Sequence, residues 1–274
     1  MDRYVVIGNP IAHSQSPFIH QAFAEQTGQI LSYERLLLPL DNFAGGLADF
    51  VQQGGLGCNV TVPFKTDALA VADVLSERAM LAEAVNTLKV QEDGRLFADN
   101  TDGAGLVMDL KRLGVPLAGQ RILLLGAGGA ARGVMGPLLA EQPAALVVTN
   151  RTHARAEVLA TRFAGLGPVS HQPLEGLHGA FDLIINSTSA SLQGERLSLP
   201  ASLCHSNTRV YDMMYGKEDT PFMCWAAEQG VIHRYDGLGM LVGQAAESFY
   251  LWRGVRPEME PVMQALRARL EQER

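Results

Sequence analysis

A lysine and an aspartate stand where they could assist the transfer of a hydride to a carbonyl group. Lys65 follows the segment 59–64 at the carboxyl end of an expected strand, 56–62, which Pro63 stops. Asp102 lies in the polar segment 99–103. Ligands of α/β proteins bind beside the carboxyl ends of strands. An ammonium group can donate a proton to the developing alkoxide, and a carboxylate orients that ammonium. On spacing alone, Lys65 could equally be a solvated surface residue and Asp102 part of a capped turn.

Two further polar pairs have the same two interpretations. Ser14 with Ser16, and Asn86 with Thr87, could bind a polar ligand, but Ser16 also precedes a proline and could cap a helix. The seven histidines are scattered, and none stands at a spacing typical of metal ligands. We therefore expect no metal site.

A glycine-rich turn indicates a dinucleotide site. The apolar run 121–125 leads into Gly126-Ala127-Gly128-Gly129-Ala130-Ala131 and then into a helical pattern. Gly126 permits the tight turn, Gly128 lets the backbone approach a pyrophosphate, and Ala131 is small enough for close packing of helix on strand. The N–H groups of the helix N-terminus attract the anion. The alternative is a glycine-rich turn without a ligand.

The residues after the next strand indicate which dinucleotide binds. A site for NAD places an acidic residue there, about 20 residues on, to bind the ribose hydroxyl. Here the segment 146–148 is followed by Thr149-Asn150-Arg151-Thr152, with Arg155 one turn further and no acid. Arginine suits bidentate binding of phosphate, so we predict NADP(H) in preference to NAD(H). The alternative is that both arginines are solvated surface charges.

Apolar runs of strand length alternate with helical patterns along most of the chain, which is typical of a parallel α/β architecture. In the first half we expect strands at 4–7, 31–38 and 56–62 and a hairpin of 85–90 with 95–98. A second series of strands is expected at 121–125, 145–149, 181–185, 209–213 and 231–235. Two helices, expected at 240–252 and 258–271, fall outside this second series.

Composition narrows the possible partners. A chain of 274 residues is long enough for two domains, and 47% apolar residues suit a sizeable core. The net charge of −7 argues against nucleic acid as a partner, because that needs a basic face. We expect a monomer or a homodimer.

The cysteines and the N-terminus bear on the location of the protein. Cys58, Cys204 and Cys224 are odd in number and lack Cys-x-x-Cys spacing, which favours reduced thiols in the cytoplasm. The early apolar run is too short for a signal peptide, and no run of about 18 apolar residues could span a membrane. We therefore expect a cytoplasmic protein that does not enter a membrane.

Seven segments match, in order, the motifs of one enzyme family and run nearly from end to end of the chain. They are Gly8-Asn9-Pro10 through Ser14-Gln15-Ser16-Pro17, Asn59-Val60-Thr61-Val62-Pro63-Phe64-Lys65, Ala84-Val85-Asn86-Thr87, Asp99-Asn100-Thr101-Asp102-Gly103, Gly126-Ala127-Gly128-Gly129-Ala130, Asn150-Arg151-Thr152, and Gly239-Met240-Leu241-Val242-Gly243-Gln244-Ala245. The sequence therefore closely resembles the shikimate dehydrogenase family. Seven motifs in this order are highly specific.

The resemblance implies an NADP-dependent oxidoreductase that reduces 3-dehydroshikimate reversibly to shikimate, in chorismate and aromatic amino-acid biosynthesis. It implies that Lys65 and Asp102 are the catalytic pair. The substrate's carboxylate and ring hydroxyls would be held at positions matching Ser14, Ser16, Thr61, Lys65, Asn86, Asp102, Tyr215 and Gln244. NADP(H) would be held at positions matching Gly126, Ala127, Gly128, Gly129, Ala130, Asn150, Arg151, Thr152, Arg155 and Thr188, with Met213 and Gly237 near the nicotinamide.

The expected fold class is α/β, with an N-terminal α/β substrate lobe and a Rossmann-type doubly wound parallel sheet. We expect a substrate-binding catalytic domain at 1–103 and an NADP-binding domain at 104–237. The resemblance implies that the C-terminal helices, 238–274, pack back onto the first lobe.

The sequence departs from the family pattern at one position, and two other functions are alternatives to the one that the resemblance implies. Ser191 stands near a position where many members carry glycine, which bears on cofactor contacts from Thr188 and Ser189. The nearest rival is a quinate/shikimate dehydrogenase with broader cofactor use. A rival of another class is a non-catalytic NADP-sensing protein, for which the Lys65–Asp102 pair would have no use.

Overall fold

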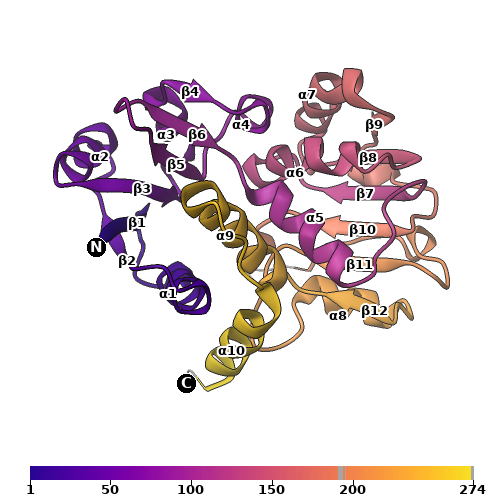
Figure 1. Ribbon diagram of the computed structural model, residues 1–274. Helices are drawn as coiled ribbons and strands as arrows, with labels where there is room; N and C mark the ends of the chain where they lie inside the picture. The colour runs from indigo at the N-terminus through magenta and orange to yellow at the C-terminus, as the bar shows by residue number, and fades with distance from the viewer. Residues whose placement is uncertain (191–193, 195, 273–274) are drawn as a thin grey trace. The chain divides into compact units, whose positions relative to one another are not determined.

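The computed structural model describes residues 1–190, 194 and 196–272 and divides into two compact units. The first comprises Met1–Gly105 and Leu241–Arg269, and the second comprises Leu106–Met240 with the residues from Leu270 onward. Each unit contains a six-stranded sheet and helices (Figure 1). The predicted α/β fold class is therefore confirmed.

The sheet of the first unit has the strand order β2-β1-β3-β5-β6-β4. Its strands are β1 (Asp2–Gly8), β2 (Leu31–Leu37), β3 (Gly55–Val60), β4 (Val74–Leu75), β5 (Thr87–Val90) and β6 (Leu96–Asp99). Strand β1 pairs in parallel with β2 and β3, whereas β5 runs antiparallel to both β3 and β6. The predicted hairpin is confirmed as β5–β6, and its turn includes Gly94 at a φ of 81°. Because the hairpin joins this sheet, the sheet is mixed, and the expectation of a parallel architecture is wrong here.

The helices that begin in this part of the chain are α1 (Ser16–Thr27), α2 (Phe43–Gln52), α3 (Lys65–Val71), α4 (Glu77–Ala82) and α5 (Asp102–Arg112). The prediction that Ser16 caps α1 is wrong by one position. Gln15 is the N-cap, Ser16 is the first helical residue, and the Ser16 N–H donates to Ser14 Oγ at 3.3 Å. Gly28 ends α1 in the left-handed conformation.

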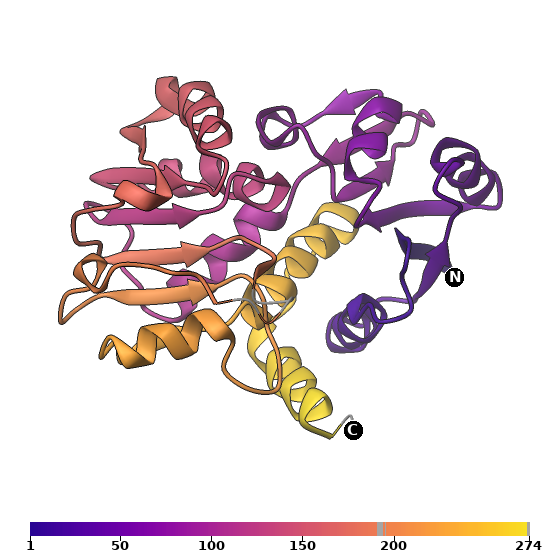
Figure 2. The ribbon, with the colours of Figure 1, turned by 180° about the vertical axis from the view of Figure 1, so that it is seen from behind.

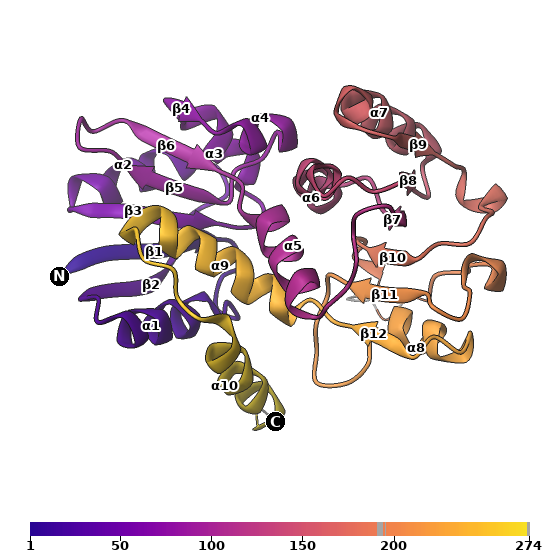
Figure 3. The same ribbon diagram turned by 45° about the vertical axis from the view of Figure 1, so that its right-hand side comes forward.

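Helix α9 (Leu238–Arg253) lies beside the first sheet, and α10 (Met259–Gln272) follows it (Figure 3). The indole N–H of Trp252 donates to the carbonyl of Leu88 at 2.9 Å, and the Lys89 ammonium donates to the carbonyl of Leu251 at 2.9 Å. The ring of Trp252 also stacks on Tyr4 with a centroid distance of 4.7 Å. These contacts hold α9 against strands β1 and β5.

A buried histidine lies in the aromatic core of the first unit. The His20 ring stacks on Tyr33 at 4.2 Å between centroids, and both side chains bond to Asn59 Oδ1, at 3.1 and 2.7 Å. Burial lowers the pKa of His20 from 6.5 to about 3, although the bond to Asn59 acts in the opposite direction. His20 is therefore neutral in the folded protein at ordinary pH.

The sheet of the second unit is parallel throughout, in the order β12-β11-β10-β7-β8-β9 (Figure 2). Its strands are β7 (Arg121–Leu125), β8 (Ala145–Thr149), β9 (Val169–His171), β10 (Leu183–Asn186), β11 (Arg209–Asp212) and β12 (His233–Tyr235). Its helices include α6 (Gly129–Ala140), α7 (His153–Phe163) and α8 (Pro221–Glu228). From β7 the strand order runs to one edge of the sheet through β8 and β9, and from β10 it runs to the other edge through β11 and β12. Doubly wound sheets bind ligands at such a switch point, here between β7 and β10. Strand β9 was not predicted.

The central strand of this sheet is apolar on both faces. Residues Ile122, Leu123 and Leu124 of β7 are fully buried, which explains the continuous apolar run. Within residues 1–190, 194 and 196–272, no helix has the length and apolar character needed to cross a membrane.

The neutral, buried state of His20 predicts a pH dependence of stability. Below pH 6.5 the unfolded chain binds a proton at this histidine that the folded chain does not bind until about pH 3, so stability falls as the pH falls. We expect His20→Gln to reduce this decline by up to about 1.4 kcal/mol per pH unit between pH 6 and 4. Urea unfolding at several pH values measures the slope. The exposed His13 offers a control, since His13→Gln should leave the slope unchanged; an equal slope in His20→Gln would contradict the prediction.

Candidate functional site

Lys65 and Asp102, the two residues that the sequence suggested for acid–base chemistry, are in direct contact. Lys65 is the first residue of α3, five positions after the end of β3, and Asp102 is the first residue of α5. Lys65 Nζ donates to Asp102 Oδ2 at 2.5 Å, and the two side chains are 30% and 14% exposed. The pair is therefore partly shielded from water and still open to a ligand. A carboxylate in the first turn of a helix is also favoured by the helix dipole.

Asn86 binds the other oxygen of the carboxylate. Its Nδ2 donates to Asp102 Oδ1 at 2.9 Å, to Thr101 Oγ1 at 2.8 Å and, at 3.3 Å, to Gln244 Oε1. The N–H of Thr101 donates to Asn86 Oδ1 at 2.8 Å. The structure thus brings Asn86 and Gln244, which are far apart in sequence, into one polar group with the Lys65–Asp102 pair.

The segment that carries Asp102 is anchored by a partly buried ion pair. The carboxylate of Asp99 accepts two bonds from the guanidinium of Arg78, at 2.7 and 2.6 Å, and one from Ser76 at 2.6 Å. Burial acts to raise the pKa of Asp99, but the bonds and charge of Arg78, with the bonds from Ser76 and the Asn100 N–H, together outweigh it, and the pKa is lowered. Arg78 also donates to Glu247 of α9 at 3.1 Å. The backbone that leads to Asp102 is therefore fixed from both α4 and α9.

Ser14, Ser16 and Thr61 belong to the same unit. The guanidinium of Arg35 donates twice to the carbonyl of Ser14, at 3.1 and 2.6 Å, which fixes the turn before α1. Thr61 packs so closely on Gly8 that a Cβ at residue 8 would lie 2.6 Å from its methyl carbon. Tyr215, the remaining predicted substrate contact, belongs to the second unit.

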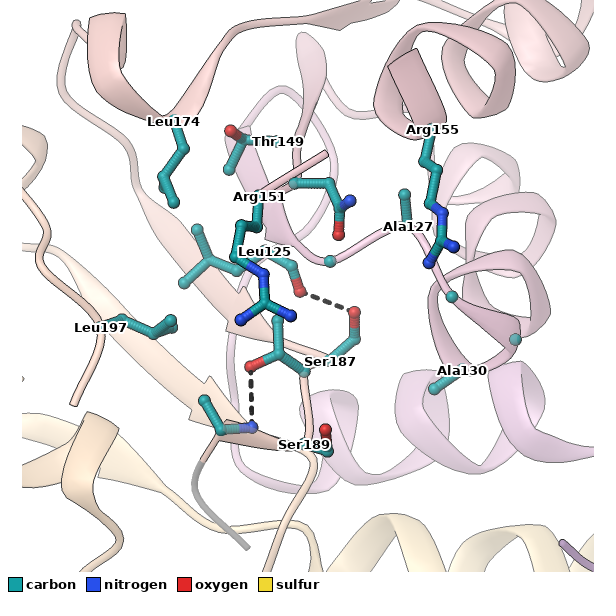
Figure 4. A pocket seen from close by; sticks show the side chains of 16 residues that line it. Leu125, Ala127, Ala130, Thr149, Arg151, Arg155, Leu174, Ser187, Ser189 and Leu197 are labelled. Carbon is teal, nitrogen blue, oxygen red and sulfur yellow. Dashed lines mark hydrogen bonds between the residues drawn. The ribbon is translucent and has the colours of Figure 1, made fainter. Parts of the chain in front are cut away.

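A cavity of about 410 Å³ opens at the carboxyl end of β7 in the second unit (Figure 4). It is lined by Leu125, Gly126, Ala127, Gly128, Gly129, Ala130, Thr149, Asn150, Arg151, Arg155, Leu174, Ser187, Thr188, Ser189, Ala190 and Leu197. Gly126 has a φ of 108°, and a Cβ there would lie 2.5 Å from Ser187 Oγ. The N-cap of α6 is Gly128, which has no side chain to occupy the N–H groups of the first turn. These groups and the helix dipole make the end of the cavity suited to an anion.

Two arginines supply positive charge to this cavity. Arg151 follows β8 and Arg155 lies in the first turn of α7, and both guanidinium groups extend into the space beside the glycine loop (Figure 4). The cavity thus combines backbone donors with two guanidinium groups, the chemistry that a dinucleotide with an additional phosphate requires.

Most of the residues predicted to hold the cofactor line the cavity, and three do not. Thr152 is exposed and forms the N-cap of α7, outside the lining. Met213 and Gly237 pack on each other beyond β11, where a Cβ at residue 237 would lie 2.0 Å from the Met213 carbonyl. Ser191 lies outside the residues that the structure describes.

Further residues line the cavity although the sequence did not predict them, among them Leu174, Ser187 and Leu197. Ser187 follows the carboxyl end of β10 and donates to the Leu125 carbonyl at 2.6 Å, which joins two neighbouring strand ends. Its position after a buried strand is the same signal that identified Lys65. The two leucines are separated from the glycine loop in sequence, and no local pattern marks them. Among the described residues, no group of three or more His, Cys, Asp and Glu side chains could hold a metal ion.

Comparisons with known proteins identify related chains. Residues 6–88 match the shikimate dehydrogenase substrate binding domain, residues 109–194 match shikimate / quinate 5-dehydrogenase, and residues 237–267 match the shikimate 5'-dehydrogenase C-terminal domain. A shikimate dehydrogenase (NADP(+)) of Aeromonas hydrophila subsp. hydrophila is 61% identical over 270 residues, which are 98% of this chain and 99% of the relative.

Two crystal structures share the fold. An Ael1 enzyme from Pseudomonas putida has a TM-score of 0.93 and 45% identity, covering 97% of this chain and 98% of that one. The shikimate 5-dehydrogenase of Thermus thermophilus, in complex with NADP(H) and shikimate, has a TM-score of 0.87 and 37% identity, covering 98% of this chain and 99% of that one.

The two arginines of the cavity predict how the protein distinguishes its dinucleotide. Arg151→Ala removes a charged donor to the extra phosphate, so we expect the Michaelis constant for NADPH to rise at least about tenfold. Initial rates at varied NADPH concentration measure the change. Lys111→Ala removes a cation of the same unit that is paired with Glu141 and does not line the cavity, so it should leave this constant unchanged. An unchanged constant in Arg151→Ala would remove the assignment.

Proposed function

The chain belongs to the shikimate dehydrogenase family, and we propose that it catalyses the reversible, NADPH-dependent reduction of 3-dehydroshikimate to shikimate. This is an oxidoreductase reaction of chorismate and aromatic amino-acid biosynthesis. The observation that carries the proposal is the 2.5 Å contact of Lys65 with Asp102 in a chain 61% identical to an NADP(+)-dependent shikimate dehydrogenase. A family member without activity would have no use for this pair.

Separate parts of the chain hold the two reactants. Residues 1–103 form the substrate-binding catalytic domain, together with the C-terminal helices of 238–274, and residues 104–237 bind NADP(H). This assignment is supported by the position of the polar group around Asp102 in the first unit and of the 410 Å³ cavity in the second.

The substrate is held by side chains that suit its carboxylate and ring hydroxyls. They are Ser14, Ser16, Thr61, Lys65, Asn86, Asp102, Tyr215 and Gln244. Hydroxyl and amide groups can both donate and accept, so they can bind a polyhydroxylated ring without a large charge. The mutual hydrogen bonds of Asn86, Asp102 and Gln244 support their inclusion in one site.

The cofactor cavity has the donors that NADP(H) requires. The glycine loop 126–130 and the N-terminus of α6 receive the pyrophosphate, while Asn150, Arg151 and Arg155 hold the extra phosphate, with Thr152 beside them at the N-cap of α7. Thr188, Met213 and Gly237 complete the site toward the nicotinamide. When bound, NADPH supplies the hydride.

Lys65 and Asp102 carry out the proton chemistry as one unit. As the carbonyl carbon gains the hydride, a proton is needed on the oxygen, and Lys65 Nζ is the group that holds it. Asp102 Oδ2 orients the ammonium toward the position of the reacting oxygen. Because the two groups are in direct contact, the effects of replacing them should not add.

We propose the cytoplasm as the location, which the free cysteines Cys58, Cys204 and Cys224 support. The partner is a small molecule rather than nucleic acid or a membrane, and the protein acts as a monomer or a homodimer.

The first test is an assay with the purified protein. We expect shikimate to reduce NADP⁺ at mildly alkaline pH, with an increase in the absorbance of the reduced nicotinamide. Parallel assays with quinate and with NAD⁺ should be much slower. Comparable rates with either would favour a quinate/shikimate dehydrogenase, and no reduction in any assay would favour an NADP-sensing protein.

Replacing the lysine tests the mechanism. Lys65→Ala should lower kcat at least about a hundredfold, because the group that exchanges a proton with the reacting oxygen is lost while the cofactor cavity is intact. Steady-state kinetics with shikimate and NADP⁺ separate kcat from the Michaelis constants. The double variant Lys65→Ala with Asp102→Asn should be hardly slower than the single variant. A change confined to the Michaelis constant for shikimate would make Lys65 a binding residue.

A further inference from the structure

Three hydroxyl side chains, those of Thr87, Thr101 and Ser248, meet next to Asn86, and we call them the hydroxyl cluster. All three residues have 0% exposure, so a substrate cannot reach their side chains. Thr87 Oγ1 lies 2.8 Å from Ser248 Oγ, which lies 3.2 Å from Thr101 Oγ1. Buried hydroxyls without partners are costly, so a cluster of this kind fixes the groups that it bonds to.

The hydroxyl cluster bonds to both ends of the Asn86 amide. Thr87 Oγ1 donates to Asn86 Oδ1 at 2.9 Å, and Asn86 Nδ2 donates to Thr101 Oγ1 at 2.8 Å. The backbone N–H of Thr101 also donates to Asn86 Oδ1. Since a backbone N–H can only donate, the oxygen of the amide must face it, and the nitrogen is turned toward Asp102.

Asn59 sets the direction of the Thr87 hydroxyl. Its Nδ2 donates to Thr87 Oγ1 at 3.1 Å and to the backbone carbonyl of Asn86 at 3.2 Å, a group that can only accept. Tyr33 donates to Asn59 Oδ1 from the other side at 2.7 Å. Ser248 Oγ donates to the carbonyl of Gln244 and accepts from Asn59 Nδ2 at 3.0 Å, so the Thr87 proton faces two acceptors, Asn86 Oδ1 and Ser248 Oγ.

We propose that Thr87 and Ser248 are positioning residues for the reaction. They hold the Asn86 amide so that its nitrogen donates to Asp102 Oδ1, which leaves Oδ2 for Lys65. Ser248 also ties this arrangement to α9, because Ser248 and Thr101 both bond to the Gln244 carbonyl. The inference rests on the proposed function, since it assigns a role to residues that act through the proposed catalytic pair.

The test compares variants that differ only in the hydroxyl. Thr87→Val keeps the branched shape and removes the hydroxyl, and we expect kcat for shikimate oxidation to fall about tenfold, as for a small displacement of reacting groups. Thr87→Ser keeps the hydroxyl and should stay within about threefold of the unaltered enzyme. The dissociation constant of NADPH, measured by its fluorescence, should be the same in all three proteins.

A matched control separates positioning from general destabilisation. Thr208 is also buried, and its Oγ1 donates to the carbonyl of Phe181 at 2.7 Å in the second unit, outside the cavity lining. Thr208→Val loses a comparable bond, so it should lower the melting temperature and leave kcat unchanged. The proposal is overturned if Thr87→Val retains kcat, or if Thr87→Ser is as slow as Thr87→Val.

A second measurement does not depend on the substrate. The side-chain amide protons of Asn86, followed by ¹⁵N NMR, should exchange with solvent slowly in the unaltered protein and faster in Thr87→Val. Equal exchange in both proteins would overturn the positioning role. Failure of the unaltered protein to oxidise shikimate, with faster exchange in the variant, would instead contradict only the proposed function.

Discussion

The contact between Lys65 and Asp102 imposes the strictest requirement on the first unit. Two opposite charges that are only partly exposed lose hydration, and the loss is offset only if the remaining oxygen and its surroundings are also hydrogen-bonded. Asn86 supplies that bond, and the buried side chains around it hold its amide in one orientation. The buried polar side chains around Asn86 therefore stabilise the ion pair, because they fix the amide that bonds to its carboxylate.

The hydrogen bonds that fix Asp102 and Asn86 involve residues from distant parts of the chain. Arg78 fixes Asp99, three residues before Asp102, and Ser248 and Gln244 of α9 bond to the residues that surround Asn86. Each of these contacts joins segments separated by many residues. A substitution far from Lys65 in sequence can therefore disturb its geometry, because a hydrogen bond in a buried network depends on the position of both partners.

The second unit binds charge in a different way. A protein with a net charge of −7 can still bind an anion where backbone N–H groups and a helix dipole meet two guanidinium groups. The apolar strand β7 makes this possible, since burial on both faces fixes the position at which the chain turns at Gly126. In this unit the rigid sheet orients the backbone donors, whereas in the first unit side chains orient one another.

The features that depend on local pattern could be predicted from the amino-acid sequence. Local pattern predicted the strand 121–125, the turn at Gly126, the arginines after β8 and the family motifs around Lys65 and Asp102. Strand periodicity and glycine turns are short-range properties, so they can be recognised in the sequence. Local pattern also predicted the hairpin. It did not predict that the hairpin joins the first sheet and makes that sheet mixed.

Which of these residues come into contact depends on the folded chain. It placed Asn86 between Asp102 and Gln244, put Ser187 against the glycine turn, and left Thr152 out of the cavity lining. It also moved the cap of α1 from Ser16 to Gln15. These outcomes depend on contacts between segments distant in sequence, and the energies of such contacts are set by packing and burial, which no local pattern records.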